Sequence, residues 1–356
     1  MPQKFAFTTA AMATALEETP VSYEELAEIE RAFDDVETEI IRKQIDLTTP
    51  LYTSRQKTLS KIPNFWPLVL EQAPPDIDQY IQPSDSALLL SSLSSLSVTH
   101  FESSLPGGDP RSVAIRFEFS ANEYFEDRVL EKKFWWRRAK DGWTGLVSEP
   151  VGIDWKKGKD LTGGLGTLVA RAWEARSTTN GKGKMAEGKE KGELSAEHKA
   201  LKKAIDGTSM GGLSFFAWFS FIGRHISAEE SAAANALEDR KREARKKGTV
   251  VETGVMEEEE GEEEEGEEEE DMSLEIFPDG DDLAVAISDD LWPGAIKYFT
   301  QAQEQDALSS SDFESDDEND DEKEDEDEKD APSPLHSEPE TSDAEMGRPK
   351  KKARKE

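Results

Sequence analysis

The chain has 356 residues, of which 78 are acidic and 43 basic, so its formal net charge is -35. A surface this negative is repelled by phosphate backbones, which argues against strong direct binding to DNA and favours polycationic partners. The sequence has no cysteine, which excludes disulfides, thiolate nucleophiles and cysteine-ligated metal sites. Because only 35% of the residues are apolar, part of the chain is expected to be disordered.

The N-terminal segment and the apolar content give no sign of a membrane protein. Residues 1–21 lack a continuous apolar block, so we expect a disordered arm and not a signal peptide. The longest apolar stretch, Gly211 to Gly223, is shorter than the roughly 20 residues that a bilayer requires. We therefore expect no membrane partner.

A long helix is predicted over residues 22–62, where apolar residues repeat at heptad spacing. The apolar stripe of this helix consists of Leu26, Ile29, Phe33, Val36, Ile40, Leu47 and Leu51. A helix of about 39 residues is roughly 58 Å long, more than a compact domain covers, so we expect a homodimer through this stripe. The alternative is that the stripe packs on its own domain. Pro50 is expected to kink or break the helix, because it lacks a backbone donor.

The middle of the chain shows strand patterns. Residues 113–120 alternate apolar and polar, and residues 96–101, 129–138 and 145–155 give three more candidate strands. Asp141-Gly142 is a hairpin signal between the last two. Short connections predict a four-stranded antiparallel meander, so the fold class is α+β.

Helices are predicted on both sides of this meander. The leucine-rich residues 77–93 indicate a helix packed under the sheet, and residues 213–222 and 283–299 indicate aromatic-rich helices over one of its faces. Residues 177–192 are rich in Gly and Lys and predict a surface loop, followed by a short helix at 196–205. Residues 63–308 thus form one domain, with flexible inserts at about 177–210 and 248–273.

Two acidic runs carry most of the net charge. Residues 257–271 hold 13 acids, and residues 312–330 hold 14 acids and two lysines, so the runs carry -25 of the -35. Such runs repel themselves and cannot bury a core, so we expect the first to be a flexible insert and the second to belong to a disordered tail, residues 309–356.

Two basic clusters accompany the acidic runs. The tail ends in a cluster that predicts a signal for a nuclear import receptor, and hence a nuclear protein, with shuttling to the cytoplasm left open. Its basic residues are Lys350, Lys351, Lys352, Arg354 and Lys355. Residues 240–247 close a predicted helix beside the first acidic run, and we interpret them as an intramolecular counterion of that run.

The sequence contains no catalytic constellation. Its four histidines are scattered, and no two of them have the spacing of metal ligands. We therefore expect no enzyme activity, no metal and no cofactor.

Five motifs occur in a fixed order between Ser22 and Phe299. They are Lys61-Ile62-Pro63-Asn64-Phe65-Trp66, Tyr124-Phe125-Glu126, residues 153–162 (IDWKKGKDLT), residues 214–219 (SFFAWF) and Asp289-Asp290-Leu291-Trp292-Pro293. With these motifs the chain resembles the nucleosome assembly protein family of histone chaperones, most closely its SET (template-activating factor) branch. The resemblance implies a dimer built on the long helix. Each subunit would carry an "earmuff" domain of antiparallel sheet and helices, whose underside holds core histones together with acidic tails.

The resemblance also suggests which acids contact histone. In the family the last helix borders the underside, so Asp281, Asp282, Asp289 and Asp290 are expected to contact histone, the alternative being that they cap or solvate the helix. Glu257, Glu262 and Glu267 represent the first acidic run, which either binds histone or only maintains solubility. DNA competes for histones with denser charge, so nucleosome assembly and chromatin remodelling without ATP are expected.

Two other functions fit the same sequence. Members of the family stimulate a histone acetyltransferase or inhibit a serine/threonine phosphatase, so a regulatory cofactor with an acetyltransferase partner is one alternative. The other is an acidic structural or transcription-activation protein whose folded part only dimerises.

Overall fold

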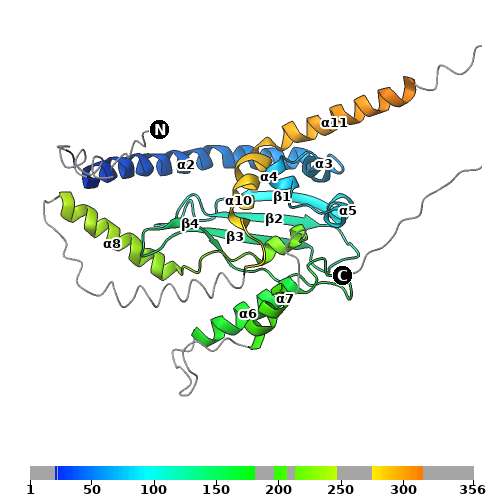
Figure 1. Ribbon diagram of the computed structural model, residues 1–356. Coiled ribbons are helices and arrows are strands. Elements are labelled where there is room, and N and C mark those ends of the chain that lie inside the picture. Colours follow the sequence, from blue (N-terminus) through cyan, green and yellow to red (C-terminus); the bar gives the residue numbers. More distant parts are fainter. Residues whose placement is uncertain (1–20, 22, 181–195, 207–212, 247–274, 316–356) are drawn as a thin grey trace, which may run out of the picture. The chain divides into compact units, whose positions relative to one another are not determined.

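The computed structural model describes residues 21, 23–180, 196–206, 213–246 and 275–315 (Figure 1). One compact unit ends at Ala307, and a second begins at Leu308. The helices are α2 (Tyr23–Leu59), α3 (Phe65–Glu71), α4 (Pro75–Asp78), α5 (Pro83–Ser92), α6 (Leu165–Asn180), α7 (Ala196–Asp206), the 3-10 helix η1 (Phe215–Ser220), α8 (Ala228–Lys246), α10 (Gly280–Val285), the π-helix η2 (Ala286–Leu291) and α11 (Trp292–Ser315). The strands are β1 (Leu93–Thr99), β2 (Val113–Phe119), β3 (Val129–Arg138) and β4 (Thr144–Ser148).

The long helix α2 confirms the heptad prediction. It runs for 37 residues, and the expected break at Pro50 does not occur. Pro50 lacks the donor for the carbonyl of Asp46, one turn earlier, so the helix continues through the proline with one backbone hydrogen bond fewer.

The sheet is the predicted four-stranded antiparallel meander, in the order β1-β2-β3-β4. Ile115 on β2 pairs with Val98 on β1 and with Lys132 on β3, which fixes the register of the three longer strands. β4 is shorter than predicted and ends at Ser148, because Pro150 cannot donate to a ladder. Trp155, expected in the same strand, forms only an isolated bridge with Phe125.

The core lies between one face of the sheet and the aromatic segment η1. Phe117, Phe134 and Trp218 are fully buried, and Phe117 contacts the Trp218 ring edge-to-face at 6.2 Å. A regular helix was predicted here, but the segment is a 3-10 helix all of whose side chains are buried. The backbone of η1 forms hydrogen bonds with other segments: the carbonyl of Phe219 accepts from the Val151 amide and from the Lys132 ammonium.

Two predictions around the sheet were wrong in extent. The helix expected at 77–93 is two short helices, α4 and α5, because Pro83 starts a new helix with a capping box formed by Gln82 and Asp85. The loop expected at 177–192 begins later, because α6 continues to Asn180. The short helix predicted at 196–205 is present as α7, and its Leu201 is fully buried.

The helix predicted at 283–299 is present with a local defect. It starts at Gly280, passes through η2 and continues as α11. Pro293, the second residue of α11, has no backbone donor, and the hydrogen bonds of the turn before it take the wider π pattern. The π-helix η2, which continues α10, contacts α4 (Figure 1).

Candidate functional site

The apolar stripe of α2 is exposed. The exposed fraction of its seven residues runs from 50% for Leu26 to 72% for Phe33. None of the seven belongs to the hydrophobic core formed by the part of the chain that the structure describes. A continuous exposed apolar surface of this kind marks an interaction site.

A different side of α2 attaches it to its own domain. Arg42 donates to the carbonyls of Ser103 and Gly108 in the loop between β1 and β2, the latter at 3.1 Å. Arg55 donates to the Trp292 carbonyl at 2.7 Å and lies 4.3 Å from the centre of the Trp292 ring. These charged side chains, together with the buried Leu59 at the end of the helix and Tyr52 against the Trp292 ring, hold α2 on the domain, whereas the seven stripe residues remain uncovered.

Helix α8 adds ion pairs near the start of α2. Arg242 pairs with Glu28 and Asp35, both at 2.8 Å, and Arg31 pairs with Glu238. The two carboxylates raise the pKa of Arg242 above its ordinary value, mainly by accepting its hydrogen bonds. Arg242 belongs to the basic cluster 240–247, so this residue of the cluster pairs with acids of the long helix. The first acidic run lies outside the described residues, so its pairing with the cluster stays a prediction.

Two of the predicted histone-contacting acids, Asp281 and Asp282, lie in the first turn of α10. Asp282 is exposed and Asp281 is half-buried, and burial raises the pKa of Asp281. Asp76 on α4 and Asp279 before α10 lie near the same phenol, Tyr80, whose pKa is raised by burial and then by the charges of all four aspartates. We call Asp76, Asp279, Asp281 and Asp282 the aspartate cluster. Asp76 was missed from the sequence because it is far from Asp281 along the chain, whereas Asp279, two residues before Asp281, could have been found from that local run of aspartates.

The other two predicted acids, Asp289 and Asp290, lie in the π-helix η2 and are exposed. Both carboxylate oxygens of Asp290 accept from the Tyr298 hydroxyl at 2.9 Å. Burial and this hydrogen bond raise the pKa of Tyr298 to about 12. Asp289 accepts from the Ser288 hydroxyl at 2.8 Å. These two acids thus have internal hydrogen-bond partners, whereas the charges of the aspartate cluster act together on the Tyr80 phenol.

The remaining predicted site residues lie outside the described residues. They are Glu257, Glu262 and Glu267 of the first acidic run, and Lys350, Lys351, Lys352, Arg354 and Lys355 of the terminal basic cluster.

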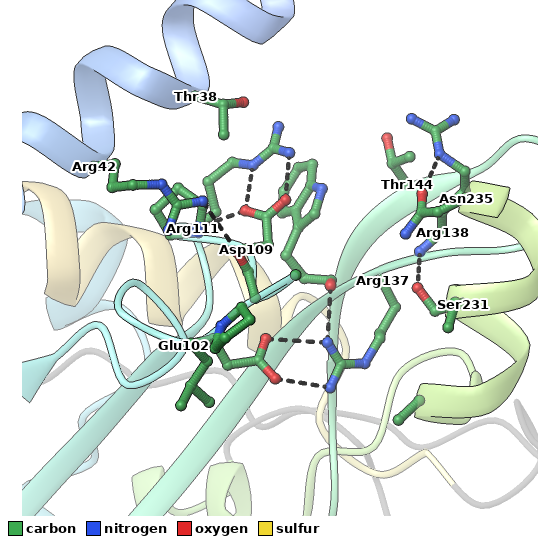
Figure 2. Close-up of a pocket in the computed structure, with 18 residues that line it drawn as sticks. Thr38, Arg42, Glu102, Asp109, Arg111, Arg137, Arg138, Thr144, Ser231 and Asn235 are labelled. Atoms are coloured by element: carbon green, nitrogen blue, oxygen red, sulfur yellow. Dashed lines mark hydrogen bonds and ion pairs between the residues drawn. The ribbon is translucent and has the colours of Figure 1, made fainter. Parts of the chain in front are cut away.

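A cavity of about 300 Å³ lies between α2, the end of β3 and α8, and its lining includes Arg42, Arg111, Arg137 and Arg138 (Figure 2). We call it the arginine pocket. Sequence reasoning did not find it, because its residues come from separate segments of the chain.

A lysine is buried inside the domain. The Lys132 ammonium donates to the carbonyls of Glu149, Phe219 and Phe221 at 2.9, 3.1 and 2.8 Å, so all three donors bond to backbone. Burial lowers its pKa to about 7, and the nearby Glu275 carboxylate acts in the opposite direction. These bonds join β3 to the segment around η1, which is an architectural role.

In the described ranges, no group of three or more His, Asp or Glu side chains could hold a metal ion. No described helix combines the length and apolarity needed to cross a bilayer.

Known proteins place the chain in a family. The model of the family described as "Nucleosome assembly protein (NAP)" matches residues 17–302. A Schizosaccharomyces pombe protein described as a nucleosome assembly protein is 39% identical over 154 residues, covering 40% of this chain and 61% of the relative. NAP1-related protein 2 of Arabidopsis thaliana is 31% identical, covering 42% and 56%, and Protein SET of Drosophila melanogaster is 28% identical, covering 41% and 53%. The chain thus spans between half and two thirds of the length of these relatives.

Solved structures give a weaker likeness. The crystal structure of Ccp1 is 25% identical with a TM-score of 0.45, covering 83% of this chain and 97% of that chain. The structure of Vps75 is 21% identical with a TM-score of 0.47, covering 79% and 98%. The assignment rests on the family model, which matches most of the 356 residues. This chain therefore belongs to the nucleosome assembly protein family.

Proposed function

We propose that this chain is a histone chaperone, which binds core histones through acidic surfaces and passes them to DNA without ATP. Membership of the nucleosome assembly protein family carries the proposal. The charge distribution supports it, because two acidic runs hold -25 of the net -35, and histones are the strongly basic partners of such chains. The relatives are matched over only part of their length, so the function itself is a proposal for this chain.

The aspartate cluster and the acidic runs have different roles in this proposal. The cluster belongs to the folded domain, where the charges of its four carboxylates all raise the pKa of Tyr80. The runs, in contrast, act as tethered polyanions. Each exposed ion pair contributes only about 0–1 kcal/mol, but tethering keeps the partners at high effective concentration. Binding is then strong at low salt and reversible when DNA competes with its denser charge.

We also propose that two copies of the chain associate through the apolar stripe of α2. The support is the exposure of all seven stripe residues, together with the polar attachment of α2 to its own domain. Burying seven side chains at about 1.5 kcal/mol each is worth roughly 10 kcal/mol per chain. The basic cluster at 350–355 would direct the dimer to the nucleus.

The histone proposal is tested by a binding titration. The full chain, a chain lacking both acidic runs, and the double variant Asp281→Asn with Asp282→Asn are titrated with each core histone pair at about 0.15 M and about 0.5 M salt. We expect weaker binding and a shallower salt dependence in the deletion, and a smaller loss in the double variant. A matched control, Glu118→Gln with Glu131→Gln, removes two carboxylates from the sheet surface.

The control should bind histone like the full chain. If the deletion keeps both the affinity and its salt dependence, the runs do not bind histone. If the full chain binds neither histone pair at the lower salt concentration, the chaperone proposal fails. A histone acetyltransferase recovered from a pull-down at higher yield than histones would favour the regulatory alternative.

A further inference from the structure

We propose that the arginine pocket binds a peptide with clustered carboxylates. This inference goes beyond histone binding, because the pocket has the opposite charge to a histone-binding surface. Its lining contains four arginines, Arg42, Arg111, Arg137 and Arg138, and two acids, Glu102 and Asp109. The lining is therefore formally +2, in a chain whose net charge is -35.

Two of the arginines are held by the two acids. Arg137 donates to both carboxylate oxygens of Glu102, each at 3.1 Å, and Arg111 donates to both oxygens of Asp109 at 2.8 and 2.7 Å. The guanidinium of Arg111 also lies 4.1 Å from the centre of the Trp136 ring. These pairs hold the side chains of Arg111 and Arg137 in place on one side of the pocket (Figure 2).

Arg138 is the residue with spare capacity to bind a ligand. Its Nε donates to the Asn235 side-chain oxygen on α8 at 3.0 Å. Its two terminal nitrogens have no ion-pair partner among the described residues. A guanidinium presents its remaining N–H groups as a planar fork that matches a carboxylate. Arg42, across the pocket, uses its terminal nitrogens on two backbone carbonyls, and its Nε pairs with Glu39, outside the lining, at 3.5 Å.

The size of the pocket limits the ligand. About 300 Å³ accommodates one or two acidic side chains, together with hydrogen bonds from the polar lining residues Thr38, Thr144 and Ser231. A DNA duplex presents a continuous row of phosphates. A small pocket beside exposed acids such as Asp34 and Asp35 is poorly matched to such a row. An acidic peptide can insert a single side chain.

The chain itself carries a ligand of this chemistry. Helix α8, which lines the pocket through Ser231 and Asn235, ends at Lys246, and the first acidic run starts at Glu257. The intervening ten residues can span up to about 35 Å, and Asn235 is only about 16 Å from the end of the helix. Tethering would give this run a high effective concentration at the pocket. An acidic segment of another protein is the second source of the same chemistry.

The test measures peptide binding by fluorescence anisotropy. The probe is a labelled peptide with the sequence of residues 257–271, and the protein is the full chain in which a Gly/Ser linker of equal length replaces those residues. We expect binding that Arg138→Gln weakens about 5- to 20-fold, the effect of one lost charged hydrogen-bond pair. Asn235→Asp should weaken it similarly, because the near-isosteric carboxylate neutralises Arg138 without removing the existing hydrogen bond. The matched control Arg116→Gln removes one positive charge from the same sheet outside the pocket and should change affinity less than twofold.

The unaltered full chain identifies the source of the ligand. If the probe binds it at least tenfold more weakly than the linker chain, the chain's own run occupies the pocket, and equal binding assigns the pocket to an acidic segment of another protein. The proposal is overturned if the linker chain does not bind the peptide, or if Arg116→Gln weakens binding as much as Arg138→Gln. It is also overturned if a short DNA duplex, and not the peptide, binds in a manner that depends on Arg138. Circular dichroism of each variant confirms that it is folded.

Discussion

Replacing Phe33 with glutamate tests whether the apolar stripe is a dimer interface. Phe33 is the most exposed residue of the stripe, with 72% of its surface accessible. Full burial of a phenylalanine is worth up to about 3 kcal/mol, so the part still exposed represents about 2 kcal/mol. In a symmetric dimer the substitution occurs twice, which gives a loss of about 4 kcal/mol before any cost of burying the carboxylates. This loss corresponds to an increase of about 1,000-fold in the dimer Kd.

The assay is sedimentation velocity over a dilution series, which reports the dimer Kd directly. The matched control is Leu90→Glu, which places the same charge at an exposed apolar position on α5, 43% accessible and away from the long helix. We expect the control to dimerise like the unaltered chain. A Phe33→Glu variant with the same Kd as the control, or an unaltered chain that is monomeric at every concentration, would refute the reasoning.

Two further predictions concern the buried polar groups that hold the domain together. The buried carboxylate of Asp85 accepts hydrogen bonds from Ser214, Phe215 and Gln82 at 2.5, 2.7 and 3.0 Å. Because an amide can accept with only one oxygen, Asp85→Asn should lower the free energy of unfolding by about 1–3 kcal/mol. An unchanged urea midpoint would contradict this. For Lys132, burial lowers the pKa to about 7 in the folded chain, so between about pH 7 and the unfolded value near 10.4 the unfolded chain binds more protons and stability from this group rises with pH. The free energy of unfolding, measured in urea, of the unaltered chain minus that of Lys132→Met should therefore be larger at about pH 9.5 than at about pH 7. A value that stays constant or falls would argue against the low pKa.

The elements that the sequence predicted well are those with a strong period. Seven residues at heptad spacing defined α2, and the alternation from Val113 to Phe119 defined β2, because each period places the apolar side chains on one face of the element. The boundaries failed where a single proline decided the outcome. Pro83 starts α5 and separates it from α4, Pro150 lies two residues after the end of β4, and Pro293 lies two residues after the π-helix, whereas Pro50 lies inside an unbroken helix.

The candidate sites were less predictable, because they combine distant segments. The aspartate cluster includes Asp76 and Asp279, and the arginine pocket includes Arg42, Arg111 and Arg138. In each case the residues are too far apart along the chain for a local sequence pattern to link them. One signal was present and missed. In β3 the core-facing positions run Leu130, Lys132, Phe134, so the alternation itself places a lysine in the core. A charged residue at an apolar position of a strand indicates a buried polar contact.

The central claim, that this chain is a histone chaperone, is tested most directly by histone transfer to DNA. Core histones are first bound to the chain, a linear or relaxed DNA is added without ATP, and nucleosome formation is followed by nuclease protection. We expect protected particles to form without ATP, and the chain to be released free of DNA. The claim is contradicted if the chain leaves histones as aggregates on the DNA, if it needs ATP, or if it remains bound to DNA itself.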